Sequence, residues 1–141
     1  MIAYFDTSAV IPLIIEEPSS EVCSRLWDAA TRAVSIRLLY PEARAALARA
    51  RRMGRISGAQ LLAAVTELDG LIAQIDHIEI TPELARAAGE LAQTHGLRGY
   101  DAVHLAAAST AADDSLVLAT GDAELVAAAQ ARGLAVARTT Q

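Results

Sequence analysis

The sequence predicts an α/β protein with a parallel β-sheet covered on both faces by helices. Short apolar runs rich in β-forming residues alternate with longer segments whose apolar residues recur at helical spacing. Single helices or helix pairs separate the predicted strands, as expected for crossover connections between parallel strands. A chain of 141 residues, 53% of them hydrophobic, is long enough to bury a core, and we expect residues 1–141 to form a single domain.

The first half of the chain is expected to contain two strands and four helices. The strands cover residues 1–5 and 33–35, and the helices cover residues 8–15, 20–30, 36–53 and 57–72. Thr7 or Ser8 is suited to cap the first helix. Pro41 belongs either at a kink or in the first turn of the main part of the third helix, which Gly54 ends. Ser57 opens a capping box for the fourth helix.

The second half of the chain is expected to contain three strands and three helices. The strands cover residues 75–80, 115–120 and 134–137, and the helices cover residues 82–95, 123–132 and a segment that begins near Tyr100. Thr81 followed by Pro82 is a typical helix start, and Gly96 and Gly133 are typical residues just after a helix end. Asp101 lies at the beginning of the middle helix.

Composition excludes several classes of site. The chain has no lysine, which excludes Schiff-base chemistry and the lysine-containing phosphate-binding loop. The single cysteine, Cys23, has no partner for a disulfide and is expected in the core. No apolar run approaches the length of about 20 residues that a membrane span requires. Since Met1 leads directly into a strand, we expect a cytoplasmic protein without a secretory leader or membrane contact.

Charge is distributed unevenly along the chain. The net charge is −5, which by itself argues against nucleic acid as a partner. Residues 36–55, however, carry six arginines and one acid, a local charge of +5. A basic stripe of this kind can bind a phosphate backbone even on an acidic protein.

Four acids are predicted to meet at one edge of the sheet. Asp6 and Asp122 each follow a strand, and Glu42 and Asp101 lie near the starts of helices. The carboxyl ends of parallel strands, and the helix starts that follow them, lie on the same side of an α/β domain. Clustered carboxylates repel one another unless a cation compensates them, and Mg²⁺ prefers oxygen ligands. Such an ion would suit phosphodiester hydrolysis.

Each acid also has a simpler explanation. Asp6 could be only a turn or cap residue after its strand. Asp101 is well placed to be only a helix cap, and Asp122 to be only a turn residue. Glu42 could be a solvated neighbour of Arg44 and Arg49. The four acids taken as a set, and not any one of them alone, favour a functional site over these separate explanations.

The chain resembles the PIN domain, and in size and layout it is similar to the VapC toxins of bacterial toxin–antitoxin pairs. Four motifs in the expected order carry this resemblance: Phe-Asp6-Thr-Ser-Ala, Tyr-Pro-Glu42-Ala-Arg-Ala-Ala-Leu, Tyr-Asp101-Ala-Val-His-Leu-Ala-Ala-Ala and Thr120-Gly-Asp122. It implies a three-layer α/β/α sandwich with a mostly parallel sheet. It further implies a metal-dependent ribonuclease with Mg²⁺ or Mn²⁺ held by the four acids, a homodimer, and a VapB-type antitoxin whose C-terminal segment occupies the groove of the toxin.

The resemblance also suggests supporting residues. Thr7 and Thr120 match hydroxyl positions of the family, which we assign to orienting the acids or bound water. His104 lies three residues after Asp101, on nearly the same helix face, and is expected to support the site or to pack. Many relatives carry an aromatic residue soon after the last acid, where this chain has Glu124, which we expect at the surface.

The arginines of residues 36–55 are the best candidates for contact with RNA or with the antitoxin. They are Arg44, Arg49, Arg51, Arg52 and Arg55. The alternative is a solvated helix end whose positive charges complement the helix dipole.

Two other functions remain open from the sequence. One is a PIN-fold binding module without nuclease activity. The other is an aspartyl-phosphate phosphatase with Asp6 as nucleophile, which is disfavoured because Ser8 occupies the place of the second acid and no lysine is present.

Overall fold

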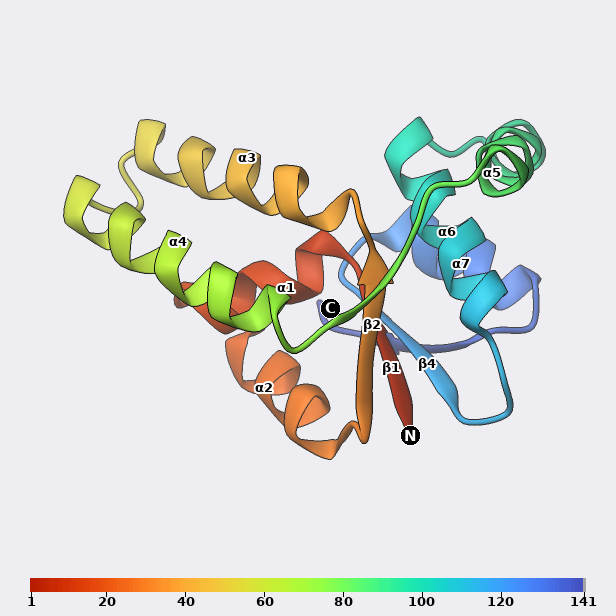
Figure 1. Cartoon of the computed structure of the whole chain (residues 1–141), viewed down its shortest axis with the longest axis horizontal. Helices are drawn as coiled ribbons and strands as arrows, with labels where there is room; N and C mark the ends of the chain where they lie inside the picture. The colour runs from red at the N-terminus through yellow and green to blue at the C-terminus, as the bar shows by residue number, and fades with distance from the viewer. Residues whose placement is uncertain (141) are drawn as a thin grey trace.

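A five-stranded sheet forms the centre of the computed structural model, which describes residues 1–140 (Figure 1). The strand order is β3-β2-β1-β4-β5, and every adjacent pair is parallel. The strands are β1 (Ile2–Phe5), β2 (Arg32–Ile36), β3 (Asp76–Ile78), β4 (Leu116–Thr120) and β5 (Ala135–Arg138). The predicted parallel sheet is therefore confirmed.

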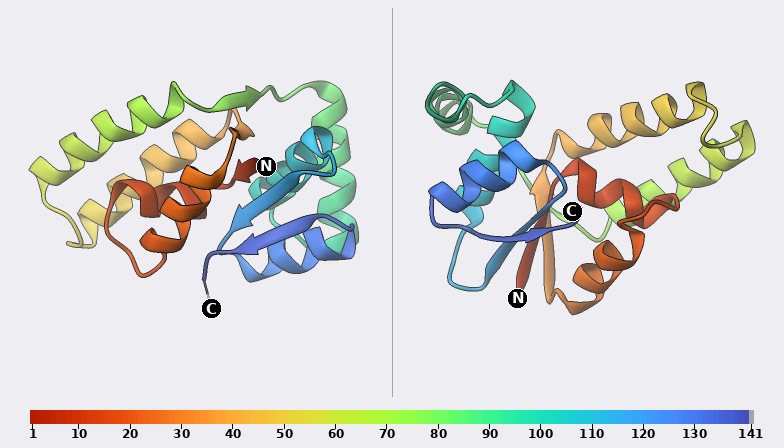
Figure 2. Two further views of the ribbon diagram at one scale, coloured as in Figure 1. Left: turned by 90° about the horizontal axis from the view of Figure 1, so that it is seen from below. Right: turned by 180° about the vertical axis from the view of Figure 1, so that it is seen from behind.

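Helices cover both faces of this sheet and make three layers, as predicted (Figure 2). The helices are α1 (Thr7–Ile14), α2 (Ser20–Ala29), α3 (Leu39–Arg52), α4 (Gly58–Ile72), α5 (Pro82–His95), α6 (Gly99–Ala111) and α7 (Ala123–Ala131). Buried residues of α1 to α4 form one hydrophobic cluster with the sheet, and those of α5 to α7 form another. No helix within residues 1–140 is long and apolar enough to cross a membrane.

Strand β1 separates the two clusters. Tyr4 is fully buried in the cluster with α5 to α7, and Phe5 is fully buried in the cluster with α1 to α4. Successive side chains of a strand point to opposite faces, so a central strand of a covered sheet is apolar on both sides. Cys23 is buried in the cluster with α1 to α4, as expected for a packing residue.

The strand order places a topological switch point between β1 and β4. From β1 the chain proceeds to β2 and then β3, and α5 and α6 return it across the sheet to β4, on the other side of β1. Ligands of open α/β sheets bind at the carboxyl ends of the strands, where the order reverses in this way. Asp6 directly follows β1, and Asp122 lies two residues after β4.

Two elements differ from the prediction by more than one residue, and the cap of one helix also differs. The helix expected from residue 36 begins at Leu39, because residue 36 completes β2 and the two following residues form a turn. Pro41 consequently lies in the first helical turn, where its missing N–H does no harm. The strand expected over residues 75–80 is limited to Asp76–Ile78. The cap of α1 is Asp6 itself, not Thr7 or Ser8.

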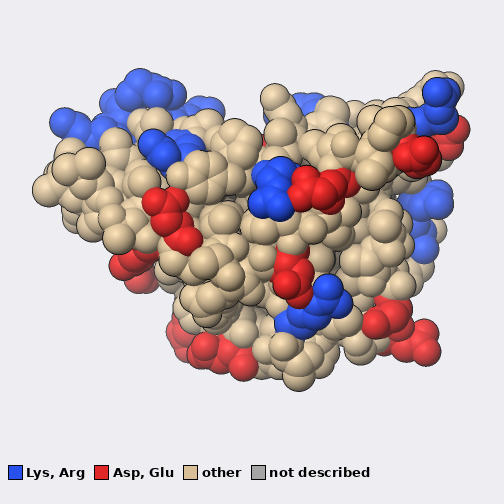
Figure 3. Space-filling view, in the orientation of Figure 1, with Lys and Arg blue, Asp and Glu red and all other residues tan. Residues whose placement is uncertain are grey.

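Helices α3 and α4 form a hairpin that projects from the sheet (Figure 1). The far end of this hairpin carries most of the arginines predicted to contact RNA, which form the concentration of positive charge at the upper left of Figure 3. Arg49, Arg51 and Arg52 are exposed there, and no carboxylate within residues 1–140 lies within ion-pair distance of them. Arg55 is paired with Glu17 at 3.3 Å.

Candidate metal centre

Asp6 is the most constrained acid of the site. One carboxylate oxygen accepts hydrogen bonds from the Ser8 hydroxyl at 2.7 Å and from the Ala9 N–H at 3.1 Å. The other oxygen accepts from the Thr120 hydroxyl at 2.6 Å. Asp6 is only 4% exposed, so the strand end and the helix cap fix its side chain together.

The segment after β4 is tied to the segment after β1. The Thr120 hydroxyl accepts from the Asp122 N–H at 3.0 Å, and the Gly121 N–H donates to the Ser8 hydroxyl at 2.9 Å. A Cβ atom on Gly121 would lie 2.9 Å from a methyl carbon of Thr140, so a larger residue here would displace the Thr140 side chain. Asp122 caps α7 through a 2.9 Å hydrogen bond from Leu125 N–H. Asp122 therefore caps α7 while its backbone is linked through Thr120 to Asp6.

Glu42 is held by a buried histidine. Nε2 of His104 lies 2.8 Å from Oε1 of Glu42, and Nδ1 lies 2.8 Å from the Tyr4 hydroxyl. An ionised carboxylate can only accept, so Nε2 carries the hydrogen of the first contact. In the neutral imidazole the Tyr4 hydroxyl then donates to Nδ1. Because His104 is 2% exposed, it orients Glu42 from within the core.

Asp101 lies in the first turn of α6, beside the exposed Arg98. Oδ2 of Asp101 is 3.8 Å from Nε of Arg98, and Oδ2 of Asp122 is 3.9 Å from Nη2 of the same guanidinium. These are ion-pair distances without hydrogen bonds, and the Arg98 side chain is 82% exposed, so the attraction is weak. Oδ2 of Asp101 is buried and has no hydrogen-bond partner within residues 1–140.

Burial raises the pKa of two of these acids. The pKa of Asp6 is raised by desolvation, which outweighs the opposing effects of His104 and of hydrogen bonds from Thr120 and Ser8. Desolvation also raises the pKa of Asp101, and the nearby charge of Asp122 adds to this effect. The site therefore holds acids whose ionised forms lack full compensation from the protein.

Residues 1–140 do not form a closed metal cage. No three His, Cys, Asp or Glu side chains within that range are close enough together to hold an ion as they stand. Three of the acids instead interact with other groups of the protein: Asp6 accepts from two hydroxyls, Glu42 contacts His104, and Asp101 lies at ion-pair distance from Arg98. The donor chemistry nevertheless fits a hard divalent cation, because all four acids offer oxygen and Asp101 Oδ2 is buried without a partner.

Some supporting residues lie where the sequence suggested, and others do not. The hydroxyl of Thr120 contacts Asp6, whereas that of Thr7 has no hydrogen-bond partner within residues 1–140. Glu124 is exposed at the start of α7. Arg44 packs along α3 with its guanidinium on the Tyr40 ring and hydroxyl.

Three residues of the site were missed from the sequence. Ser8 contacts Asp6, which the Asp-x-Ser spacing after a strand could have indicated. Arg98 lies three residues before Asp101, a spacing at which helical neighbours meet. Tyr4 carries no local signal, because its contact with His104 joins residues 100 positions apart.

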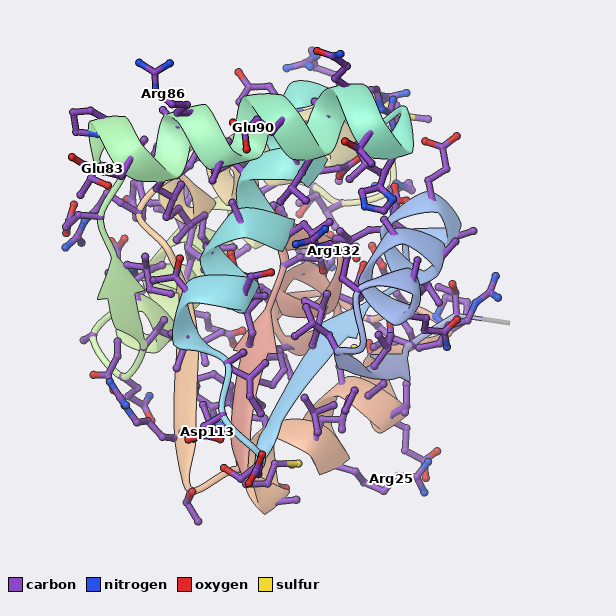
Figure 4. All side chains as sticks on the ribbon, turned by 90° about the vertical axis from the view of Figure 1, so that its right-hand side faces the viewer. Arg25, Glu83, Arg86, Glu90, Asp113 and Arg132 are labelled. Carbon is purple, nitrogen blue, oxygen red and sulfur yellow. The ribbon has the colours of Figure 1, made fainter. Side chains whose placement is uncertain are left out.

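Other acids near strands stay outside the site. Asp113 precedes β4 and lies at the amino end of that strand, opposite the end at which Asp122 follows it (Figure 4). Hydrogen bonds from Ser115 lower its pKa, as expected for a turn residue at the surface. Position at the carboxyl end of the strands therefore distinguishes the candidate site from ordinary turn chemistry.

Comparison with known proteins places this arrangement in a family. The family model described as PIN domain matches residues 3–131. The chain is 42% identical over 136 residues to ribonuclease VapC45 of Mycobacterium tuberculosis (strain CDC 1551 / Oshkosh), covering 96% of this chain and 94% of that protein.

Solved structures share the fold. PAE2754 from Pyrobaculum aerophilum has a TM-score of 0.71 at 25% identity, with 96% of this chain and 92% of that chain covered. A chain of a toxin–antitoxin complex from Klebsiella pneumoniae has a TM-score of 0.69 at 18% identity, with 99% and 98% covered.

The raised pKa of Asp6 predicts how stability depends on pH in metal-free protein. Between the unfolded value, near 3.8, and the higher folded value, the folded state holds more protons than the unfolded state. The free energy of unfolding of the wild type, relative to Asp6→Asn, therefore falls as pH rises through that window and is constant above it.

Urea unfolding of both proteins in EDTA, from about pH 4 to about pH 8, measures this difference. The asparagine retains an oxygen for Ala9 N–H and can donate to Thr120, so its fold is expected to be intact. A wild type that gains stability relative to the variant as pH rises would show that the protein favours the ionised carboxylate.

Proposed function

Because the chain belongs to the PIN-domain family, we propose that it is a metal-dependent endoribonuclease of the VapC type that hydrolyses RNA phosphodiester bonds. The observation that supports this proposal is that Asp6 follows β1 and Asp122 follows β4 at the switch point of the sheet. The charge of Asp122 acts on Asp101, and burial raises the pKa of both Asp6 and Asp101. The 42% identity to a protein named as a ribonuclease supports the same activity.

The four acids are the proposed ligands of Mg²⁺ or Mn²⁺. When bound, such an ion supplies electrophilic assistance to the phosphodiester and a more acidic water molecule. Asp6 contributes a carboxylate whose position is fixed by Ser8 and Thr120. His104 holds Glu42 in one orientation. The exposed Arg98 lies at ion-pair distance from Asp101 and Asp122, and it would be available to substrate phosphates if a bound cation neutralised these acids.

The proposal includes a protein partner. The solved toxin–antitoxin complex shares this fold, and we propose that the chain forms a homodimer and binds a VapB-type antitoxin. It would act in the cytoplasm, on RNA. The arginines at the far end of α3 are available to either partner, because Arg49, Arg51 and Arg52 have no acidic neighbour at ion-pair distance within residues 1–140.

The two alternative functions, a binding module and an aspartyl-phosphate phosphatase, have less support. A binding module without activity has no need for acids such as Asp6 and Asp101, whose pKa is raised by burial. In a phosphatase mechanism Asp6 must attack a phosphate, but three hydrogen bonds already fix its two oxygens. Ser8, which occupies the place of the second acid, is one of the donors.

Removing one charge from the site should abolish cleavage. Asp6→Asn and Asp101→Asn each remove the negative charge of a proposed ligand without changing side-chain shape, and RNA cleavage is expected to fall by at least about a hundredfold. Glu124→Gln is the matched control, since it removes an exposed acid from the first turn of α7. Wild-type cleavage by both site variants would contradict the assignment.

Divalent cations should stabilise the wild type. Mn²⁺ that binds only the folded state adds about 2.7 kcal/mol at a hundred times its Kd, which a thermal melt resolves. The shift should be absent in Asp101→Asn. EDTA should stop cleavage, and added Mn²⁺ or Mg²⁺ should restore it. Cleavage that persists in EDTA would require a different mechanism.

The basic end of α3 should contribute to RNA affinity by neutralising phosphates. Arg51→Ala combined with Arg52→Ala should weaken binding to single-stranded RNA. The slope of log affinity against log salt should become shallower by about 0.7 for each phosphate that the variant no longer neutralises. Arg25→Ala, on α2, serves as the control. An unchanged slope would leave these arginines with only a helix-end role.

A further inference from the structure

A pocket opens directly beside the acid site. It has a volume of about 340 Å³ and is lined by residues of three helices and of the turn before α3: Thr7, Leu38, Pro41, Glu42, Ala45 and Tyr100. Apart from Glu42 and the hydroxyls of Thr7 and Tyr100, these side chains are apolar. Glu42 forms a wall of this pocket and also contacts His104, so the pocket and the proposed metal site share one carboxylate.

Tyr100 presents the only largely exposed aromatic ring within residues 1–140. It is 61% exposed, while Tyr4 and Phe5 are fully buried. Trp27 packs on Phe5, and Tyr40 is engaged by Asp69 and Arg44. Tyr100 directly precedes Asp101 in the first turn of α6. The same helical turn therefore positions the ring and a proposed ligand.

We propose that this pocket binds the nucleobase adjacent to the scissile phosphate, with Tyr100 as its stacking surface. Aromatic side chains next to a phosphate-binding site are the usual platforms for unpaired bases, because every base has a π-face. Glu42 belongs to both the pocket and the acid site. A base in the pocket would therefore lie next to the phosphate whose hydrolysis is proposed to take place at these acids. The inference rests on the proposed ribonuclease function and names a substrate contact within it.

The polar groups of the pocket also suit a base. The Thr7 hydroxyl lines the pocket and has no hydrogen-bond partner within residues 1–140. A hydroxyl can donate or accept, so it can contact the edge of a stacked base. A peptide segment would be expected to use charge complementarity, but Glu42 is the only charged residue of the lining and is already held by His104.

The test compares Tyr100→Ala with Tyr100→Phe. The substrate is single-stranded RNA of random sequence, cleaved in Mn²⁺. Removal of the ring should lower kcat/KM by about 5- to 150-fold, the range for removal of one stacking aromatic, whereas phenylalanine should stay within about twofold of wild type. Ala45→Leu, which fills the pocket and keeps the ring, should also lower kcat/KM. Leu62→Ala removes an exposed apolar side chain from α4 and should have no effect.

A second measurement uses RNA that lacks one base. Once the cleavage position is mapped, oligonucleotides with an abasic residue on either side of the scissile phosphate are compared. One of the two should reduce wild-type cleavage to the level of Tyr100→Ala and leave that variant unchanged. A merely structural role of Tyr100 would lower cleavage of intact and abasic RNA equally, and that result would overturn the inference.

Two further outcomes would also overturn it. Tyr100→Ala that cleaves RNA like the wild type, but binds the product of a neighbouring antitoxin gene less well, would assign the pocket to a peptide. A wild type that binds Mn²⁺ yet neither binds nor cleaves RNA would refute the proposed function, and the base subsite with it. If the wild type cleaves RNA and Tyr100→Ala cleaves it equally well, only the base subsite is refuted.

Discussion

The hydrogen bond from Thr120 to Asp6 joins the carboxyl ends of two neighbouring strands, and the geometry of the site depends on it. These residues are 114 positions apart in the chain, and β1 and β4 bring them together. Thr120 also accepts from the Asp122 backbone, and Ser8 links Asp6 to Gly121. This network fixes the two strand-end acids relative to each other, and it does so by burying a carboxylate at an energetic cost that hydrogen bonds only partly offset.

The protein alone does not fully compensate the negative charges of the four acids. Hydroxyl and amide groups satisfy Asp6, His104 satisfies Glu42, and the exposed Arg98 lies at ion-pair distance from both Asp101 and Asp122. Arg98 is an inefficient counter-ion because solvent screens it. A divalent cation would compensate several acids at once, so the same burial that destabilises the metal-free site would favour metal binding. The aromatic pocket at Glu42 extends this polar centre toward a substrate that carries bases as well as phosphates.

Local sequence predicted the elements well and the contacts between them poorly. The acids at strand ends, the proline and glycine boundaries and the alternation of strands with helices are local signals, so the parallel sheet followed from them. The helix start at Leu39 was misplaced because residue 36 is apolar and fits either a strand or a helix. Strand order, the Tyr4 to His104 contact and the pairing of Arg98 with two acids depend on residues distant in the chain, which no local pattern encodes. The resemblance to the PIN domain supplied the grouping of the acids that spacing alone left open.

Acids from separate elements are proposed to bind one divalent cation, and anomalous diffraction from a crystal grown with Mn²⁺ would locate that cation. We expect an anomalous peak at the carboxyl ends of β1 and β4, with oxygens of Asp6 and Asp101 among the ligands at distances expected for a hard cation. A peak elsewhere on the molecule, or none at saturating Mn²⁺, would contradict it.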